Sequence, residues 1–273
     1  MFSKSVLTSN HKNLAVLFSR SGKTTEVIYA LDYLCKQGIR IIGVTCAENS
    51  PLAIKSDIAL VLTPILERSI VTTRSLTGML LTTQLLAAIV EDNKVFFSEL
   101  CCLPELFKLK VEEYHKLGKM IGRQTRLRKY TFVGNGPFFG LAHKSQLKIK
   151  GMTLLPADSY PMFDFRHGPQ SNVNENMLVV AFISDSAQKG EFKFLQEMKN
   201  FGGVIWALCD QLNDKLQNYI DYVFELKSEL SELARGPLYM PAIQLMAYHR
   251  SLILGLNPDK PYNVPYWVNI SEQ

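Results

Sequence analysis

A short stretch near the start of the chain concentrates groups that bind phosphate. Between an apolar run at residues 14–18 and a helical pattern that reaches Lys36, the sequence carries four hydroxyl side chains within seven residues. A phosphate dianion needs several hydrogen-bond donors with a helix N-terminus behind them, and a glycine lets backbone N–H groups approach. Ordinary helix capping explains one of these hydroxyls, not four. The stretch therefore predicts a phosphate site built from Ser19, Arg20, Ser21, Gly22 and Thr24.

The run Gly22-Lys23-Thr24 also suggests a nucleotide-binding P-loop. That motif requires a glycine five positions before Gly22, where this chain has Leu17. The P-loop interpretation therefore fails, and we expect no cofactor. No His, Asp and Cys cluster in the sequence suggests metal ligands either, so we expect no metal.

Two parts of the chain share one design, and the elements they predict would position this turn. Residues 14–46 and 178–209 each read as an apolar strand, a Ser-containing turn, an amphipathic helix and a second apolar strand. The pair Ser19 and Ser184 is 165 residues apart (184 − 19), and Cys46 and Cys209 are 163 apart (209 − 46). Uninterrupted apolar strands around a helix are typical of a parallel sheet covered on both faces. We therefore expect an α/β protein with two duplicated halves.

The two predicted halves differ at their starts and in their turns. Asp185 follows the second Ser turn, where its charge would repel an anion, so we expect one phosphate site per chain. The second half has an opening strand, Tyr130–Val133, well before its Ser turn, whereas only thirteen residues precede Leu14. Either the chain is shortened at its start or the first sheet lacks strands there, so we expect a first half that looks shortened at its N-terminus.

Helical patterns separate the halves. We expect an apolar helix at residues 76–91, one or two amphipathic helices at 97–127, and a further helix at 241–254. The resulting domain prediction is a first domain at 1–95, a helical linker at 96–127, a second domain at 128–256 and a C-terminal tail at 257–273.

The composition excludes several classes of protein. The net charge is only +5 over 273 residues, without the dense basic patch of nucleic-acid binders. No apolar run approaches the ~18 residues of a membrane span. The five cysteines are odd in number and lack CxxC spacing, which indicates buried free thiols in a reducing compartment. We expect a cytoplasmic protein that binds neither nucleic acid nor membrane.

These motifs resemble the sugar isomerase (SIS) domain family over nearly the whole chain. The turn at residues 19–24 looks like the family's phosphate loop, residues 134–137 (Gly-Asn-Gly-Pro) resemble the turn that opens the second SIS domain, and residues 166–169 (Arg-His-Gly-Pro) are similar to the Lys/Arg-His-Gly-Pro signature of one branch. That branch holds the isomerase half of glucosamine-6-phosphate synthase, amino-sugar-phosphate deaminases and tagatose-6-phosphate ketose/aldose isomerase. The resemblance implies two SIS-type halves, each a parallel sheet flanked by helices in a flavodoxin-like or Rossmann-like arrangement.

The resemblance also implies roles for residues outside the turn. His167 would open the sugar ring as acid and base, and Lys148 would stabilise the enediolate. Thr72 and Thr73 would line the sugar, and Glu67 is a conceivable base. In the relatives the histidine comes from the partner subunit, which implies a homodimer with a shared active site.

Two positions depart from the family pattern. The glutamate that moves the proton between C1 and C2 is replaced by Gly151, with Asp158 and Asp164 downstream as candidate substitutes. The lysine that synthases carry in their tail is replaced by Tyr266, which argues against imine chemistry. Synthases also need a glutamine-hydrolysing domain with an N-terminal cysteine, and this sequence, which begins with Met1, has no such segment.

The sequence thus predicts an aldose–ketose isomerase or deaminase that acts on a hexose or hexosamine 6-phosphate. Two alternatives remain open. The first is a non-catalytic sugar-phosphate sensor or regulatory paralogue that lacks the catalytic glutamate. The second is a shortened paralogue that works only together with a complete one.

Overall fold

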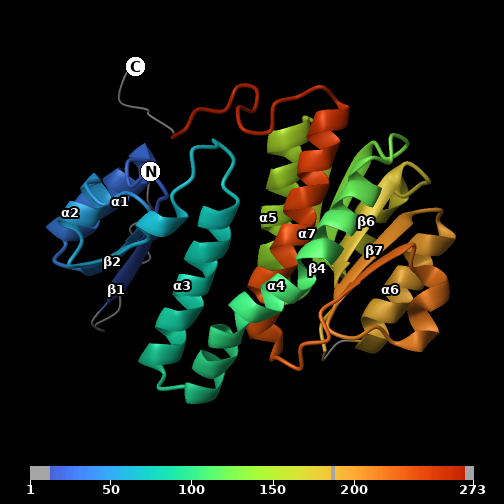
Figure 1. The fold of residues 1–273 in the computed structure, drawn as a ribbon, viewed down its shortest axis with the longest axis horizontal. Coiled ribbons are helices and arrows are strands. Elements are labelled where there is room, and N and C mark those ends of the chain that lie inside the picture. The colour runs from blue at the N-terminus through green and yellow to red at the C-terminus, as the bar shows by residue number, and fades with distance from the viewer. Residues whose placement is uncertain (1–12, 186–187, 268–273) are drawn as a thin grey trace. The chain divides into compact units, whose positions relative to one another are not determined.

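The computed structural model describes residues 13–185 and 188–267, which form two compact units (Figure 1). The first unit extends to Thr83 and includes the segment that begins at Asn263, and the second unit comprises Gln84–Tyr262. Each unit has its own parallel sheet with helices packed on it. The predicted α/β fold with two sheet-and-helix halves is confirmed.

The first unit contains a three-stranded sheet in the order β1-β2-β3. Its elements are β1 (Leu14–Phe18), α1 (Thr25–Lys36), β2 (Arg40–Thr45), α2 (Pro51–Lys55), β3 (Ile58–Val61) and the short 3₁₀ helix η2 (Thr63–Ile65). The core forms because Leu31 of α1 and Leu52 of α2 pack against Ile41 of β2, and all three side chains are fully buried. Alternate residues of β1, Ala15 and Leu17, complete this cluster.

The second unit contains a five-stranded sheet in the order β5-β4-β6-β7-β8. Its strands and their neighbouring helices are β4 (Lys129–Gly134), α5 (Pro137–Thr153), β5 (Ala157–Pro161), η3 (Asp164–Arg166), η4 (Pro169–Asn172), β6 (Met177–Phe182), α6 (Gln188–Asn200), β7 (Val204–Cys209), η5 (Asp214–Tyr219) and β8 (Tyr222–Glu225). Both faces of this sheet are covered. Val179 of β6 lies in the cluster with α6, whereas Phe182 stacks against Phe138 of α5 and Tyr239 of the last helix. Because helices cover both faces of the sheet, its strands are apolar along their whole length in the sequence.

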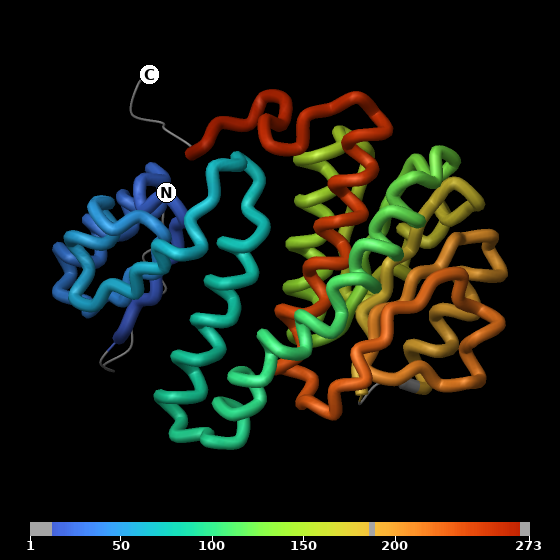
Figure 2. The backbone as a smooth tube through the Cα atoms, in the orientation of Figure 1, coloured from blue at the N-terminus to red at the C-terminus, as the bar shows by residue number. Residues whose placement is uncertain are grey.

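Three long helices complete the chain: α3 (Arg74–Val90), α4 (Lys94–Gly122) and α7 (Glu232–Ile253). The backbone can be followed in Figure 2, where α7 runs beside α4 and α5 within the second unit. The prediction for α3 is confirmed, and α4 is one helix with Pro104 inside it. The predicted start of α7 at Pro241 is wrong, because Pro237 and Pro241 both lie inside the helix. Of the helices in the described residues, none is both long and apolar enough to cross a membrane.

The duplication is visible in the hydrogen bonds, but its register differs from the sequence alignment. The Asp57 carboxylate accepts from the backbone N–H of Ile41, and Asp221 accepts from that of Ile205, both at 2.8 Å. Equivalent residues therefore lie 164 positions apart (205 − 41).

Strand pairing gives the same offset, because Phe18 pairs with Val44 as Phe182 pairs with Leu208. Ser184 is consequently the counterpart of Arg20, not of Ser19. The alignment of Cys46 with Cys209 is likewise wrong by one residue. The alignment was wrong because a serine and a cysteine recur near the strand ends of both halves, each displaced by one position from the true equivalent.

The cysteines are free thiols, but only Cys46 and Cys209 are buried. Burial raises the pKa of Cys209 to about 12 and also raises that of Cys46, so both thiols stay protonated at neutral pH. Cys35, Cys101 and Cys102 are exposed, contrary to the prediction, because they lie on outward faces of α1 and α4.

Helices α4 and α7 approach each other closely at two glycines. A Cβ atom at Gly118 would lie 2.6 Å from Cβ of Leu245, and one at Gly122 would lie 2.6 Å from the carbonyl oxygen of Met246. No side chain fits at these separations without movement of a helix. The second unit therefore depends on these glycines for its helix packing.

We predict that Gly118→Ala lowers the free energy of unfolding by about 1–3 kcal/mol, the usual cost of overpacking. The matched control is Gly140→Ala, also inside a helix, where an added Cβ meets nothing within 4 Å. That control should raise stability by about 0.5–1 kcal/mol through helix propensity. Urea denaturation measures both changes, and a neutral or stabilising Gly118→Ala would contradict the packing argument.

Candidate functional site

The predicted phosphate turn follows β1 directly and leads into α1. Ser19 and Ser21 are buried, with 6% and 8% of their surface exposed. The hydroxyls of Ser19 and Thr24 are hydrogen-bonded at 2.9 Å, and the Lys23 N–H donates to the Ser21 hydroxyl at 3.2 Å. Although Thr24 is the N-cap residue of α1, its side chain makes no capping bond. The turn thus gathers its hydroxyls at the positive end of a helix.

Gly22 is required in this turn for two reasons. Its φ is +62°, in the region that favours glycine. A Cβ at this position would also lie 2.0 Å from the hydroxyl oxygen of Ser50. The loop after β2 therefore packs directly on the turn, and the Gly22 carbonyl accepts from the N–H of Leu52 at 3.2 Å.

The Arg20 side chain fastens the turn to two other segments of the first unit. Its guanidinium donates to the carbonyls of Ser69 (2.7 Å), Ile70 (3.1 Å) and Tyr266 (3.0 Å), and it stacks 4.1 Å from the centre of the Tyr266 ring. The Tyr266 hydroxyl in turn donates to the Glu67 carbonyl at 2.9 Å. Arg20 therefore shapes the site with its side chain. At the equivalent position of the second unit, the backbone N–H of Ser184 donates to Glu191.

Glu67 lies at the start of the segment predicted to contact the sugar, where it caps α3. Its buried carboxylate accepts from the N–H and hydroxyl of Thr73, at 2.9 and 2.7 Å, and from the N–H and hydroxyl of Ser75. A cavity of about 650 Å³ opens beside it, lined by Leu66, Glu67, Arg68, Arg74 and Tyr266. Thr72 and Thr73 are half-buried in the same segment. The two arginines make this cavity electropositive.

The remaining predicted residues belong to the second unit. Lys148 lies on α5 and is buried, with 6% exposed. His167 is exposed at the end of η3, where Arg166 is held by an ion pair to Glu197 at 2.7 Å. Gly151 is on α5, and a Cβ built there meets nothing within 4 Å. The position where the family pattern has its glutamate thus has room for a side chain.

The second unit fills its own strand-to-helix turn with a carboxylate. Glu191 of α6 is fully buried and accepts three hydrogen bonds, each 2.9 Å long. The donors are the N–H and hydroxyl of Ser184, after β6, and the side-chain amide of Asn135, after β4. An internal anion thus occupies the place between two adjacent strand ends where ligands of open α/β sheets bind. Asp185 pairs with Arg235 at 2.8 Å.

In the described part of the first unit the residue equivalent to Glu191 is Val27 (191 − 164), which has no carboxylate. The equivalence is supported by the helix cores, since Leu31 and Leu195 (195 − 164) are both fully buried. Val27 is half-buried and packs on the core of the first unit. The first turn therefore has an apolar side chain where the second turn has its carboxylate.

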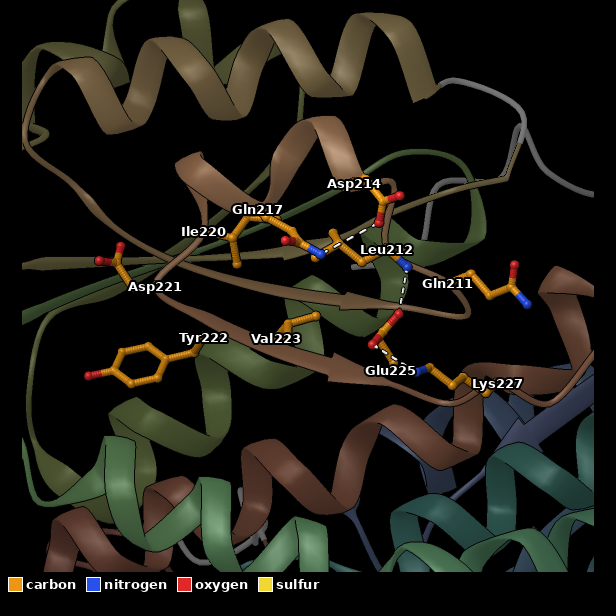
Figure 3. Close-up of a pocket in the computed structure, with 10 residues that line it drawn as sticks. All are labelled: Gln211, Leu212, Asp214, Gln217, Ile220, Asp221, Tyr222, Val223, Glu225 and Lys227. Carbon is orange, nitrogen blue, oxygen red and sulfur yellow. Dashed lines mark hydrogen bonds and ion pairs between the residues drawn. The ribbon is translucent and has the colours of Figure 1, made fainter.

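A cavity of about 570 Å³ lies beside β8 and η5 and has different chemistry (Figure 3). Its lining includes the carboxylates of Asp214, Asp221 and Glu225, against the single cation Lys227. Glu225 accepts from the Leu212 N–H at 2.8 Å and pairs with Lys227 at 3.4 Å. This negative lining disfavours phosphate. Among the described residues, no group of three or more His, Cys, Asp or Glu side chains could hold a metal ion.

The double α/β fold with a Ser/Thr turn between β1 and α1 defines the class of protein, and comparison with known proteins specifies the family. The SIS domain model matches residues 1–89 and 126–254, and the chain belongs to the SIS domain family.

Relatives with known names cover most of the chain. It is 26% identical over 271 residues to glutamine–fructose-6-phosphate aminotransferase (isomerizing) of Caldanaerobacter subterraneus, which covers 96% of this chain and 44% of the relative. The chain thus spans less than half the length of that relative. Among solved structures, glucosamine-6-phosphate deaminase of Thermotoga maritima superposes with a TM-score of 0.77 at 26% identity, over 95% of this chain and 76% of the other. Tagatose-6-phosphate ketose/aldose isomerase of Escherichia coli gives 0.81 at 23%, over 95% and 75%.

Sequence reasoning missed two features of the site. Tyr266 drew attention only as a replaced lysine, and no local pattern indicates its contacts with Arg20 and Glu67. The pair Asn135 and Glu191 was also missed. The sequence does carry a signal for it, because a glutamate stands near the start of the helical pattern that follows the second Ser turn.

We predict that Arg20→Lys lowers the free energy of unfolding by about 2–3 kcal/mol, because an ammonium cannot reach three carbonyls on two segments. The control is Arg40→Lys at the exposed start of β2, which should change little. Urea denaturation followed by circular dichroism measures both variants. Equal stability of the two variants would contradict the claim that the Arg20 side chain holds these segments together.

We predict that the buried Glu191 carboxyl makes the free energy of unfolding depend on pH. Burial raises its pKa above the ordinary value of 4.5, so the folded state binds more protons than the unfolded state above that pH. Its contribution to stability is therefore full at low pH and is lost as the pH rises through the raised pKa. Relative to Glu191→Gln, the wild type should lose unfolding free energy as the pH rises above 4.5. Parallel stability curves would contradict this.

Proposed function

We propose that this chain binds a hexose or hexosamine 6-phosphate, with the phosphate at the turn Ser19–Thr24. One observation carries the proposal. The second unit satisfies its equivalent turn with the Glu191 carboxylate, whereas the first unit has Val27 at that position and keeps its donors. A turn of the same design, without its internal anion, fits an external one.

The chemistry of the first turn supports a phosphate in particular. The Ser19 and Thr24 hydroxyls use one hydrogen between them, which leaves the other for a ligand. Ser21 accepts from the Lys23 N–H, so its own hydrogen is directed elsewhere. Together with the N-terminus of α1, these groups form a concave donor set that suits a dianion.

The sugar class follows from what the relatives share. Their names specify fructose 6-phosphate, glucosamine 6-phosphate and tagatose 6-phosphate, which all place the phosphate on the sixth carbon of a hexose. The electropositive cavity beside Glu67 and Tyr266 lies in the same unit as the turn, and we propose that it contributes to the sugar site together with Thr72 and Thr73.

Binding without isomerisation is the function that the geometry favours. The position of the family glutamate is Gly151, and the Glu67 carboxylate is already bonded to the two residues at the start of α3. A base must accept a proton from the sugar, and this carboxylate has its oxygens committed to four donors.

Isomerisation or deamination is the second candidate function. It is favoured by the presence of His167, exposed beside the pinned Arg166, and of Lys148. In this case His167 would open the ring, Lys148 would stabilise the enediolate, and the enzyme would be a cytoplasmic homodimer with a shared site, as the family resemblance implies.

We predict that Val27→Glu closes the first turn with an internal carboxylate and weakens the binding of glucosamine 6-phosphate by at least about tenfold, or ~1.4 kcal/mol. Val27→Gln has the same shape without the charge, so it should bind far better than Val27→Glu. Titration calorimetry at pH 7.5 measures both. Equal affinities for the two variants would contradict the proposed position of the phosphate.

Proton exchange distinguishes the two candidate functions. Incubated in deuterated water, the wild type should bind glucosamine 6-phosphate and fructose 6-phosphate without incorporating deuterium at C1 or C2. Gly151→Glu should introduce exchange, because the position has room for the side chain. Deuterium incorporation by the wild type that His167→Ala abolishes would instead establish an isomerase.

A further inference from the structure

The cavity beside Tyr266 is more cationic than a neutral sugar requires. Its lining includes the guanidinium groups of Arg68 and Arg74 and a single carboxylate, that of Glu67. Sugar hydroxyls both donate and accept hydrogen bonds, whereas a guanidinium only donates. Two guanidinium groups in the lining of one cavity suit a carboxylate or a phosphate better than a hydroxyl. We call this cavity of the first unit the arginine cavity.

Glu67 does not occupy these arginines. Its carboxylate accepts hydrogen bonds from the N–H and hydroxyl groups at the start of α3. Among the described residues, none of the ion pairs involves Arg68 or Arg74. Arg74 donates to the Leu66 carbonyl, but a guanidinium has five N–H groups. Both arginine side chains are exposed, so they can donate to a ligand in the cavity.

The arginine cavity is joined to the phosphate turn by Arg20. This residue belongs to the turn, and its guanidinium donates to the carbonyls of Ser69, next to Arg68, and of Tyr266, in the cavity lining. One arginine side chain thus spans the interval between the turn and the cavity, a length comparable to that of a hexose. A hexose with its 6-phosphate in the turn can therefore extend its other end, at C1 and C2, toward the cavity.

The electrostatics also connect the two places. The Cys46 thiol is buried directly after β2, and the Cys46 N–H donates to the Arg20 carbonyl at 3.0 Å. Burial raises the pKa of this thiol, as does the charge of Glu67, whereas the charges of Arg20 and Arg74 lower it. Arg74 is therefore close enough to act on the strand end that packs against the turn. The turn and the cavity lie in one electropositive region of the first unit.

We propose that this region binds a hexose 6-phosphate with a second anionic group at C1 or C2, and that Arg68 and Arg74 hold this second group. The inference rests on the proposed phosphate binding at the turn. Sugar acids phosphorylated on the sixth carbon and hexose bisphosphates both have the required form. The sugar phosphates in the relatives' names carry one anionic group each, so the ligand of this chain differs from them in charge.

A second anionic group accords with binding without isomerisation. A sugar acid has a carboxylate at C1 in place of an aldehyde, so it cannot take part in an aldose–ketose exchange. A site for such a ligand needs no base to move a proton between C1 and C2. The replacement of the family glutamate by Gly151 is then consistent with the charge of the arginine cavity.

Binding of matched ligands tests the second anionic group. The open-chain compounds 6-phosphogluconate and glucitol 6-phosphate differ only in having a carboxylate or a hydroxymethyl group at C1. Titration calorimetry should show that 6-phosphogluconate binds at least about tenfold more tightly. Arg68→Gln should remove most of this preference. Arg40→Gln, at the exposed start of β2, should retain it. Because two ligands are compared on each variant, a loss of folded protein does not produce the effect.

A second pair, fructose 1,6-bisphosphate and fructose 6-phosphate, identifies the second group. The larger preference in this pair indicates a bisphosphate, and the larger preference in the first pair indicates a sugar acid. Equal affinities within both pairs would overturn the inference, as would a preference that Arg68→Gln leaves unchanged. In either case, binding that Val27→Glu weakens would leave the proposed phosphate site intact. Failure of all four compounds to bind would instead count against the proposed function itself.

Discussion

A carboxylate held where two strands end and a helix begins is the interaction on which the second unit depends. In the second unit the anion is the chain's own carboxylate, on Glu191, and its three hydrogen bonds join the ends of β4 and β6 to α6. In the first unit the corresponding residue is apolar, and the donors of the turn remain for a ligand. One duplicated design thus holds an internal carboxylate in the second unit, and we propose that in the first unit, where Val27 replaces that residue, it holds a ligand.

The binding turn is stiffened by contacts that leave its donors in place. Gly22 allows the loop after β2 to pack on the turn, and Arg20 ties it to the segment before α3 and to Tyr266. Donors fixed before the ligand arrives lose little entropy on binding. Because Glu67 caps α3 in the same network, its carboxylate is part of the framework. This organisation supports the proposal of a binding site, and Gly151 has no side chain that could act as a base.

The fold was accessible from the sequence because it depends on local patterns, and the predicted phosphate turn rests on a pattern of the same kind. An apolar strand, a helical period and a cluster of hydroxyl residues can each be recognised within a few tens of residues. The exact register of the duplication was not accessible, since Ser184 and Cys209 match Ser19 and Cys46 in type but not in strand pairing. Contacts between distant segments, such as Arg20 with Tyr266, leave no local signal. The start of α7 was missed because proline usually breaks a helix when it lies in the helix interior. In this buried helix two prolines, Pro237 and Pro241, lie inside it.

A crystal structure with glucosamine 6-phosphate tests the central claim most directly. The account predicts the phosphate at the N-terminus of α1, within about 3 Å of the Ser21 and Thr24 hydroxyls and of the Arg20 backbone N–H. A phosphate bound elsewhere, with the turn after β1 unoccupied at saturating ligand, would contradict it.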